Sequence, residues 1–321
     1  INYKDGTIEI DGMVYPLRDT DFPTIDPADP NKLTPEEQDI IDGLISSFRR
    51  SEKLQIHTRF LYSVGSIYRR HNGNLLYHGC IPCDGNGEFM EFSLYSDTPL
   101  KGRAFLDWAD RLARQGYFAP DGSMERLRGL DFLWFLWCGR NSPICGRTKI
   151  TTFERALIED KASYTEPKNP YYVYYGSEEF CRRILDDFDL HKPWSRIING
   201  HMPVKVKEGE DPRKGGGRLV VIDGGFCKAY HKQTGIAGYT MFFSSHGMRI
   251  AAHEPFTTRE EAIHGKKDIT SHSFIVENLP RRLMISDTDA GEGIKRRIED
   301  LNALLDAYRS GTIKTDSTGR I

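Results

Sequence analysis

Two short apolar runs, each leading to a histidine beside a glycine, constrain the fold of this chain more than any other feature. Residues 75–77 lead directly to His78, which a glycine follows, and residues 196–199 lead through a glycine to His201. Apolar runs this short are typical of buried strands. In open α/β sheets ligands gather where strands end, and glycine there allows a tight turn and leaves room for a ligand. We therefore expect each imidazole at the rim of a sheet.

Stretches with helical spacing alternate with strand-like runs along the rest of the chain, which favours the α/β class. Thr34 and Glu37 have the spacing of a capping box at the start of a helix. Further helices are expected at residues 102–114, 126–137, 177–188 and 294–305, and further strands at 219–222, 238–243 and 248–252. Residues 1–33 contain four prolines and are expected to form an extended arm or returning linker. Residues 291–321 are expected to form a C-terminal helix and tail.

Charge and cysteine content exclude several classes of function. Lysine and arginine number 44 and aspartate and glutamate 46, so the net charge of −2 gives no electrostatic reason to expect a nucleic-acid or membrane partner. Apolar stretches stay well short of the roughly 18 residues that a membrane span needs. Cys80 and Cys83 form a C-x-x-C pair without the second pair of a zinc ribbon. A zinc-dependent nucleic-acid module is therefore disfavoured, and the six cysteines are interpreted as reduced thiols.

The residues that could carry chemistry each have two interpretations. Neutral imidazole suits cations such as Mn²⁺, Fe or Zn²⁺, but a histidine at the end of a strand can also hydrogen-bond a loop carbonyl. Asp223 follows the strand expected at 219–222, where its carboxylate could support a metal ligand or cap a turn. Arg147, Lys205 and Lys207 could contact a substrate phosphate, although solvated surface charge is the commoner fate of such residues.

Six longer blocks of sequence decide between these interpretations. They are residues 69–82 (RRHNGNLLYHGCIP), 151–155 (TTFER), 166–171 (EPKNPY), 197–201 (IINGH), 224–230 (GGFCKAY) and 234–240 (TGIAGYT). Together they resemble the class III fructose-1,6-bisphosphatases, a family of the calcineurin-like metallophosphatase superfamily. The resemblance runs over nearly the whole chain, and agreement by chance at all six blocks is implausible.

The resemblance implies a fold, a reaction and a metal centre. The fold would be a metallophosphatase sandwich of two mixed sheets flanked by helices, with a helical insertion, over residues 34–290. The reaction would be the hydrolysis of fructose 1,6-bisphosphate to fructose 6-phosphate and phosphate in gluconeogenesis, in the cytoplasm. His78 and His201 would bind the same metal of a two-metal site. Mn²⁺ is the expected cofactor, with Mg²⁺ or Fe as alternatives. A homo-oligomer is compatible with the resemblance, which does not fix the oligomeric state.

Three motifs of the family, G-D-x-H-G, G-D-x-x-D-R-G and G-N-H-E, have no counterpart here, and the chain contains no Gly-Asp dipeptide. These motifs supply the carboxylates, the bridging aspartate and the catalytic histidine. The chain is therefore expected to be the C-terminal half of such an enzyme, inactive by itself, with the catalytic residues in an N-terminal half. Two alternatives remain. One is a metallophosphatase for another phosphate ester, and the other is a non-catalytic binding domain if no N-terminal half exists.

Overall fold

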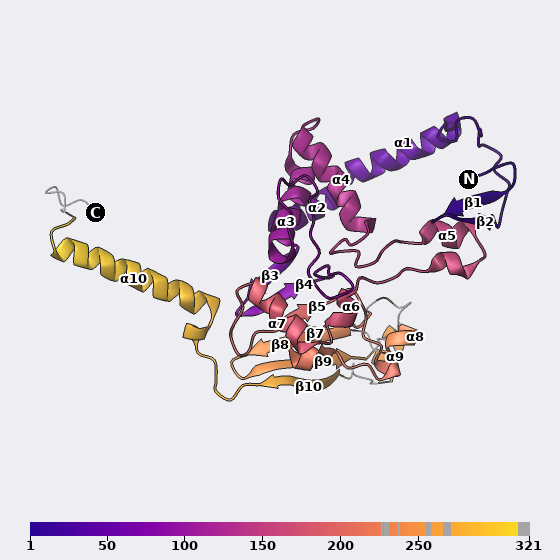
Figure 1. Ribbon diagram of the computed structural model, residues 1–321. Coiled ribbons are helices and arrows are strands. Elements are labelled where there is room, and N and C mark those ends of the chain that lie inside the picture. Colours follow the sequence, from indigo (N-terminus) through magenta and orange to yellow (C-terminus); the bar gives the residue numbers. More distant parts are fainter. Residues whose placement is uncertain (226, 228–230, 236–237, 255–257, 266–270, 314–321) are drawn as a thin grey trace. The chain divides into compact units, whose positions relative to one another are not determined.

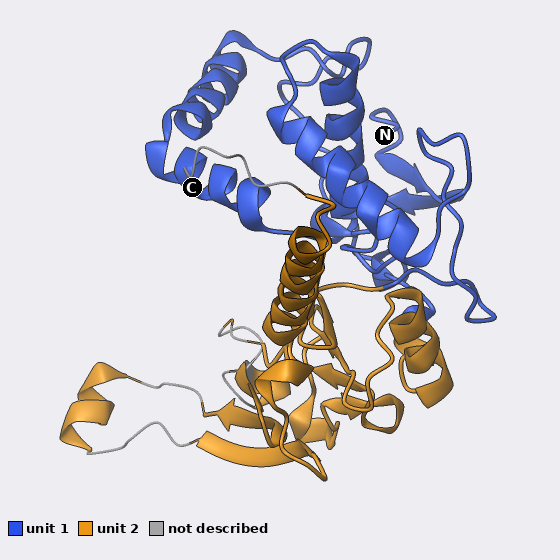
Figure 2. Cartoon of the chain, turned by 90° about the vertical axis from the view of Figure 1, so that its left-hand side faces the viewer, with its two compact units in different colours: residues 1–67, 81–171 blue, residues 68–80, 172–321 orange. Residues whose placement is uncertain are grey.

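The computed structural model describes residues 1–225, 227, 231–235, 238–254, 258–265 and 271–313. Two compact units divide the chain, and Figure 2 shows them in different colours. The first unit comprises residues 1–67 and 81–171, and the second comprises residues 68–80 and 172–321. The second unit therefore receives a short piece, residues 68–80, from the first half of the chain. The predicted boundaries after residues 33 and 290 stay predictions.

The first unit is mainly helical (Figure 1). Its elements are β1 (Thr7–Ile10), β2 (Met13–Pro16), α1 (Pro35–Arg50), α2 (Glu52–Val64), α3 (Gly102–Phe118), α4 (Met124–Cys138), α5 (Thr152–Leu157) and the 3-10 helix η1 (Lys161–Tyr164). Strands β1 and β2 form an antiparallel hairpin. The predicted capping box is confirmed, because Glu37 N donates to Thr34 Oγ1 at 3.2 Å and Thr34 N donates to Glu37 Oε2 at 2.8 Å.

Helices α3 and α4 form the core of the first unit. Phe105 and Leu106 of α3 and Phe132 of α4 are each at most 2% exposed. The two helices cross closely at Gly116 and Gly129, since a Cβ added to Gly129 would lie 2.2 Å from the backbone nitrogen of Gly116. Only glycine allows two backbones to approach so closely. This crossing brings the apolar faces of α3 and α4 into contact.

The second unit contains a five-stranded mixed sheet and a three-stranded antiparallel sheet, which confirms the α/β class (Figure 1). The mixed sheet has the order β3-β4-β5-β7-β6, and the antiparallel sheet has the order β10-β9-β8. In the mixed sheet β4, β5 and β7 run parallel, whereas the outer strands β3 and β6 run antiparallel to their neighbours. Arg196, just before β5, forms an ion pair of 2.5 Å with Glu277 of β10 and so links the two sheets.

In the second unit β4, β5, β7, β8, β9, α7 and α10 lie where the sequence predicts them, whereas β3, β6, β10, α8 and α9 were not predicted. The strands are β3 (Tyr68–His71), β4 (Asn74–Tyr77), β5 (Ile197–Asn199), β6 (Arg213–Lys214), β7 (Leu219–Val221), β8 (Gly238–Ser244), β9 (Gly247–His253) and β10 (Ser271–Asn278). The helices are α7 (Glu178–Asp187), α8 (His231–Thr234), α9 (Arg259–His264) and α10 (Asp289–Arg309), with the 3-10 helices η2 (Val206–Glu208), η3 (Gly215–Gly217) and η4 (Ile285–Asp287). Helix α6 (Tyr171–Tyr174) spans the boundary between the units.

Several helices expose apolar side chains. Within the described residues 35–64, which form α1 and α2, no residue is buried. Trp134 and Trp137 of α4 are 66% and 62% exposed. Large exposed apolar surface normally meets another segment or another chain. None of the helices in the described part of the chain is both long and apolar enough to cross a membrane.

Candidate functional site

The mixed sheet brings the two predicted histidines together. Strands β4 and β5 are adjacent and parallel, and Tyr77 is in register with Asn199. Parallel neighbours end at the same edge of a sheet, so the residues that follow them become neighbours in space. His78 and His201 follow these two strands and meet at that edge, although 123 positions separate them in the chain.

The two imidazole rings lie against each other edge to face. Their centroids are 5.1 Å apart with an interplanar angle of 84°, and Nδ1 of His201 lies 3.2 Å from Nε2 of His78. His201 has a φ of 67°, in the left-handed region that side chains other than glycine seldom adopt. Such backbone strain is concentrated at functional sites. The strained conformation accompanies the close approach of the two ring nitrogens.

Asn199 holds the loop that carries His78. Its side chain is buried, and Nδ2 lies 2.8 Å from the carbonyl oxygen of Gly79, 3.1 Å from that of His78 and 3.3 Å from that of Tyr77. The carbonyl oxygen of Asn199 also accepts a hydrogen bond of 2.9 Å from the backbone nitrogen of Ile222, just after β7. Sequence reasoning missed this role. The available signal was the position of Asn199, a polar amide at the end of an apolar strand and immediately before Gly200 and His201.

Gly200 leaves the space that His78 occupies. A Cβ at position 200 would lie 3.1 Å from Nδ1 of His78, closer than most Cβ contacts. The Gly200 nitrogen also donates a hydrogen bond of 3.1 Å to the His78 carbonyl. On another side the ring of Tyr172 stacks on His201 with centroids 6.5 Å apart. Gly200 and Tyr172 therefore restrict the positions of the two imidazoles.

The geometry of the pair fits a divalent cation. Imidazole nitrogens bind Zn²⁺ at about 2.0–2.1 Å, so two neighbouring nitrogens of one octahedral or tetrahedral centre lie roughly 2.8–3.4 Å apart. The observed 3.2 Å between Nδ1 of His201 and Nε2 of His78 falls in this range. Within the residues that the structure describes, no cluster of three or more His, Cys, Asp and Glu residues forms a complete metal site. The arrangement places two imidazole nitrogens at a separation that one cation could bridge.

Asp223 caps a turn in the structure. Its Oδ1 accepts a hydrogen bond of 2.9 Å from the Gly225 nitrogen, and its carbonyl accepts one of 2.9 Å from the Val204 nitrogen. The second of these bonds ties the segment that follows His201 to the end of β7. The turn-capping interpretation of Asp223 therefore describes what the carboxylate does here. Support of a metal ligand by Asp223 stays a prediction.

The three cations predicted to contact phosphate have protein partners. Lys205 forms an ion pair of 3.1 Å with Glu208, and Lys207 Nζ donates to the carbonyl of Lys232 at 3.2 Å. Arg147 lies in the first unit, where its guanidinium is 3.3 Å from a carboxylate oxygen of Glu166. Because each of these charges is already used within the chain, contact with phosphate stays a prediction.

Glu166 organises a charged cluster in the first unit. Thr151 donates to its Oε1 from the backbone nitrogen at 2.9 Å and from Oγ1 at 2.7 Å, and Arg155 lies 3.9 Å away. Burial by itself would raise the pKa of Glu166, but the hydrogen bonds from Thr151 and the charges of Arg147 and Arg155 outweigh it and lower the pKa. The carboxylate is therefore ionised and structural. It joins the blocks at 151–155 and 166–171.

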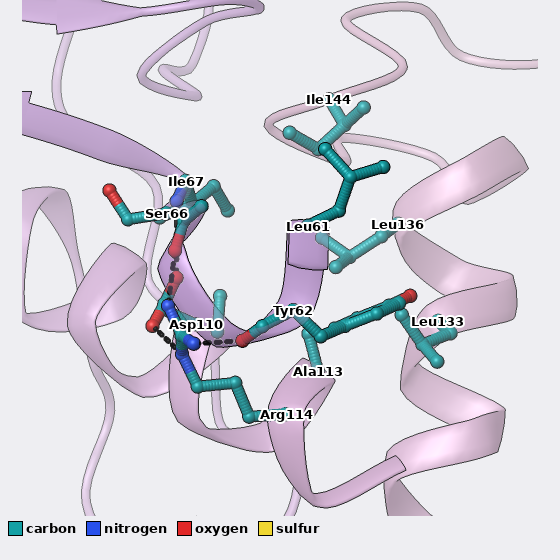
Figure 3. Close-up of a pocket in the computed structure, with 12 residues that line it drawn as sticks. Leu61, Tyr62, Ser66, Ile67, Asp110, Ala113, Arg114, Leu133, Leu136 and Ile144 are labelled. Carbon is teal, nitrogen blue, oxygen red and sulfur yellow. Dashed lines mark hydrogen bonds and ion pairs between the residues drawn. The ribbon is translucent and has the colours of Figure 1, made fainter. Parts of the chain in front are cut away.

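A cavity of about 350 Å³ lies in the first unit, between the end of α2 and helices α3 and α4 (Figure 3). Its polar groups are engaged with one another. Arg114 Nε binds Asp110 at 2.7 Å, and its other nitrogens donate to the carbonyls of Tyr62 and Gly65 at the end of α2. Cations at a helix C-terminus stabilise it. We interpret these charges as structural, because they anchor α2 to α3.

Fold and site together define an α/β protein with two histidines paired at the carboxyl edge of a mixed parallel sheet. Comparison with known proteins identifies the family. The chain belongs to the family described as Firmicute fructose-1,6-bisphosphatase, whose profile matches residues 1–310. The resemblance inferred from the six sequence blocks is thereby confirmed at the level of the family. Phe226, residues 228–230 and residues 236–237, which belong to two of those blocks, lie outside the described residues.

Curated relatives carry the same family name. The chain is 50% identical over 321 residues to the fructose-1,6-bisphosphatase class 3 of Clostridium botulinum strain 657, covering 100% of this chain and 48% of that protein. It is 49% identical over 314 residues to the protein of that name from Clostridium novyi strain NT, covering 98% of this chain and 47% of the relative. The chain thus spans about half the length of the curated relatives it matches. No solved structure matches it.

Proposed function

We propose that this chain supplies part of the two-metal active site of a cytoplasmic fructose-1,6-bisphosphatase. The complete enzyme would hydrolyse fructose 1,6-bisphosphate to fructose 6-phosphate and phosphate in gluconeogenesis. Membership of the family supports the substrate, and the 3.2 Å approach of His201 Nδ1 to His78 Nε2 is the observation that carries the proposed site.

His78 and His201 would hold one divalent cation, and Mn²⁺ is the proposed metal. Imidazole nitrogen suits Fe and, next to oxygen ligands from elsewhere in the protein, accepts Mn²⁺ more readily than Mg²⁺, which prefers oxygen ligands throughout and retains water. When bound, the metals of such a site polarise phosphoryl oxygens. The side chains of Asn199 and Tyr172 and the small Gly200 keep the imidazoles in place. Asp223 would support this edge from the neighbouring loop, and Arg147, Lys205 and Lys207 are proposed phosphate contacts.

The remaining ligands and the catalytic acid would come from an N-terminal half of the same protein. Two observations support this proposal. The chain lacks the three Gly-Asp and Gly-Asn-His-Glu motifs, and it covers 48% of its relative from Clostridium botulinum strain 657. The chain by itself would then be inactive. Reading the gene upstream of Ile1 tests this directly, since the proposal requires G-D-x-H-G there and a start codon in its place contradicts it.

Substitution in the complete gene product tests the role of the histidines. His78→Ala and His201→Ala should each lower kcat/KM for fructose 1,6-bisphosphate by more than the roughly 10–100-fold that loss of an outer partner of a metal ligand costs. His191→Ala is the matched control, because His191 is an exposed imidazole paired with Asp186. A panel of other phosphate esters distinguishes the proposed substrate. Unchanged activity in both variants contradicts the proposed site, whereas preference for another ester contradicts only the substrate.

A further inference from the structure

Helix α10 carries a stripe of apolar residues that the chain leaves exposed. The members of the stripe are Ile294, Ile298, Leu301, Leu305 and Tyr308, and each is between 44% and 63% exposed. Their spacing alternates between four and three residues, which is the heptad pattern of helices that pair along a narrow seam. A stripe of this kind on a surface helix requires a partner surface.

The beginning of α10 is fixed to the second unit, so the stripe extends from an anchored helix. Asn72 N donates to Asp289 Oδ2 at 2.7 Å, Asp289 N donates to Asn72 Oδ1 at 3.1 Å, and Lys192 forms an ion pair of 2.6 Å with Glu292. Gly291 is the buried residue of this helix. It packs so closely against Ile285 that a Cβ there would collide with the carbonyl of Ile285. The anchoring contacts use the first turn and leave the later turns to another partner.

We propose that α10 pairs with α10 of a second copy of this chain in an antiparallel coiled coil. In this register Ile294 faces Leu305 of the second copy, and Ile298 faces Leu301. The two-fold axis repeats both pairs, so the seam has four apolar layers. This proposal concerns assembly and does not rest on the proposed function.

The ends of the helix favour the antiparallel direction. The first turn is acidic, with Asp289 and Glu292, and the last turn carries the basic Arg309. Antiparallel pairing places Arg309 of one copy beside the acidic turn of the other and opposes the two helix dipoles. Near the centre Arg297 comes within reach of Asp300 of the second copy. A parallel pair would instead place like charges against each other at both ends.

The shape of the surface beside α10 also suits this direction. Beyond the last apolar layer, Tyr308 of the second copy comes opposite the first turn of α10, where Ile285 of the same chain covers Gly291. Next to this position lie Met284 and Ile285, which are 59% and 73% exposed and line a cavity of about 450 Å³. The tyrosine ring would cover this apolar surface, whereas a parallel pair would bring the two Tyr308 side chains against each other and leave Met284 and Ile285 uncovered.

Sedimentation velocity of the 321-residue chain across a dilution series tests the pairing. The unsubstituted chain should be a dimer at high concentration. Leu301→Glu should make it monomeric, because a charge would enter the centre of the seam. Ala303→Glu adds the same charge outside the seam of the same helix and should leave the dimer intact. Circular dichroism checks that both variants keep the native fold. A monomeric unsubstituted chain, or a dimer that survives Leu301→Glu, overturns the proposal.

Disulfide cross-linking tests the direction of the pair. Ile294→Cys and Leu305→Cys chains are prepared separately, with Cys138 and Cys227 replaced by serine to remove the other accessible thiols. Oxidation of the mixture should give a cross-linked dimer of the two variants, and oxidation of either variant alone should give none. Cross-linking of each variant with itself indicates a parallel pair and overturns the proposal. Absence of cross-linking in the mixture overturns it as well.

Discussion

Nδ1 of His201 lies 3.2 Å from Nε2 of His78 at the carboxyl edge of the mixed sheet. Two neighbouring residues restrict the position of His78 in this pair. Asn199 binds the loop that carries His78, and Gly200 leaves room for the His78 ring. Asn199, the last residue of β5, and Gly200, which follows it, therefore provide the sharpest tests of how the site is built.

Gly200→Ala should weaken divalent metal binding with little loss of stability. The added Cβ would lie 3.1 Å from Nδ1 of His78 and would push the ring by a few tenths of an ångström. We expect a roughly 10–100-fold lower Mn²⁺ affinity, as for other changes behind a metal ligand. Gly85→Ala is the matched control, since a Cβ there meets nothing within 4 Å. Isothermal titration calorimetry measures the Mn²⁺ affinity of both variants. Equal affinities would argue against the positioning of the His78 ring by Gly200.

Asn199→Ala should lower the free energy of unfolding by about 1–3 kcal/mol, because the carbonyls of Tyr77, His78 and Gly79 lose their buried donor. Asn199→Asp should cost at least as much near neutral pH, since it replaces the donor by a carboxylate that faces the same carbonyls. Urea unfolding measures the two variants. A stable Asn199→Asp chain would show that the amide does not hold the loop.

Gly129→Ala and Gly43→Ala should change stability in opposite directions. At position 129 the added Cβ would overlap the backbone of Gly116, so separation of α3 from α4 should cost about 1–3 kcal/mol or more. At position 43, inside α1, the Cβ meets nothing within 4 Å, and the higher helix propensity of alanine should stabilise α1 by up to about 1 kcal/mol. Thermal unfolding followed by circular dichroism compares them. A stabilising Gly129→Ala would contradict the close helix crossing.

Glu166→Gln should destabilise the chain by about 1.5–3 kcal/mol at neutral pH, because Thr151 and the two arginines then face an uncharged amide. The effect should depend on pH. The folded-state pKa of Glu166 is lowered from 4.5, so its stabilisation is complete above that value and is lost as pH falls through the folded-state pKa. Urea unfolding of both proteins at stepwise lower pH should show the difference shrinking. A difference that stays constant would contradict an ionised Glu166 at the centre of the cluster.

The sequence predicts the strands that carry the histidines because short apolar runs and adjacent glycines are local signals. It also predicts the capping box of α1, since Thr34 and Glu37 are three residues apart. The order of the strands in the sheet could not be predicted in this way, because no local signal shows that β4 pairs with β5 across about 120 intervening residues. The resemblance to the family implied only that His78 and His201 bind the same metal, and the pairing of the two strands comes from the structure, where Tyr77 is in register with Asn199.

Some roles depend on neighbours that the sequence does not reveal. Asn199 acts through carbonyls around residue 78, far away in the chain, so its amide could not be assigned in advance. Asp223 had two interpretations, and only the 2.9 Å bond from the Gly225 nitrogen distinguishes the turn cap. The partners of Lys205 and Lys207 could not be predicted either, because a surface cation pairs with whichever carboxylate or carbonyl the fold brings near it.

Titration of the ¹⁵N-histidine-labelled chain with Mn²⁺, followed by NMR, tests the central claim most directly. If the paired imidazoles bind one cation, paramagnetic broadening should begin together at His78 and His201, identified by His78→Ala and His201→Ala, before it reaches exposed imidazoles such as His191. Either substitution should also abolish the early broadening of the remaining partner. Simultaneous broadening of all the histidines, or early broadening of one member of the pair that persists without the other, would contradict a shared metal.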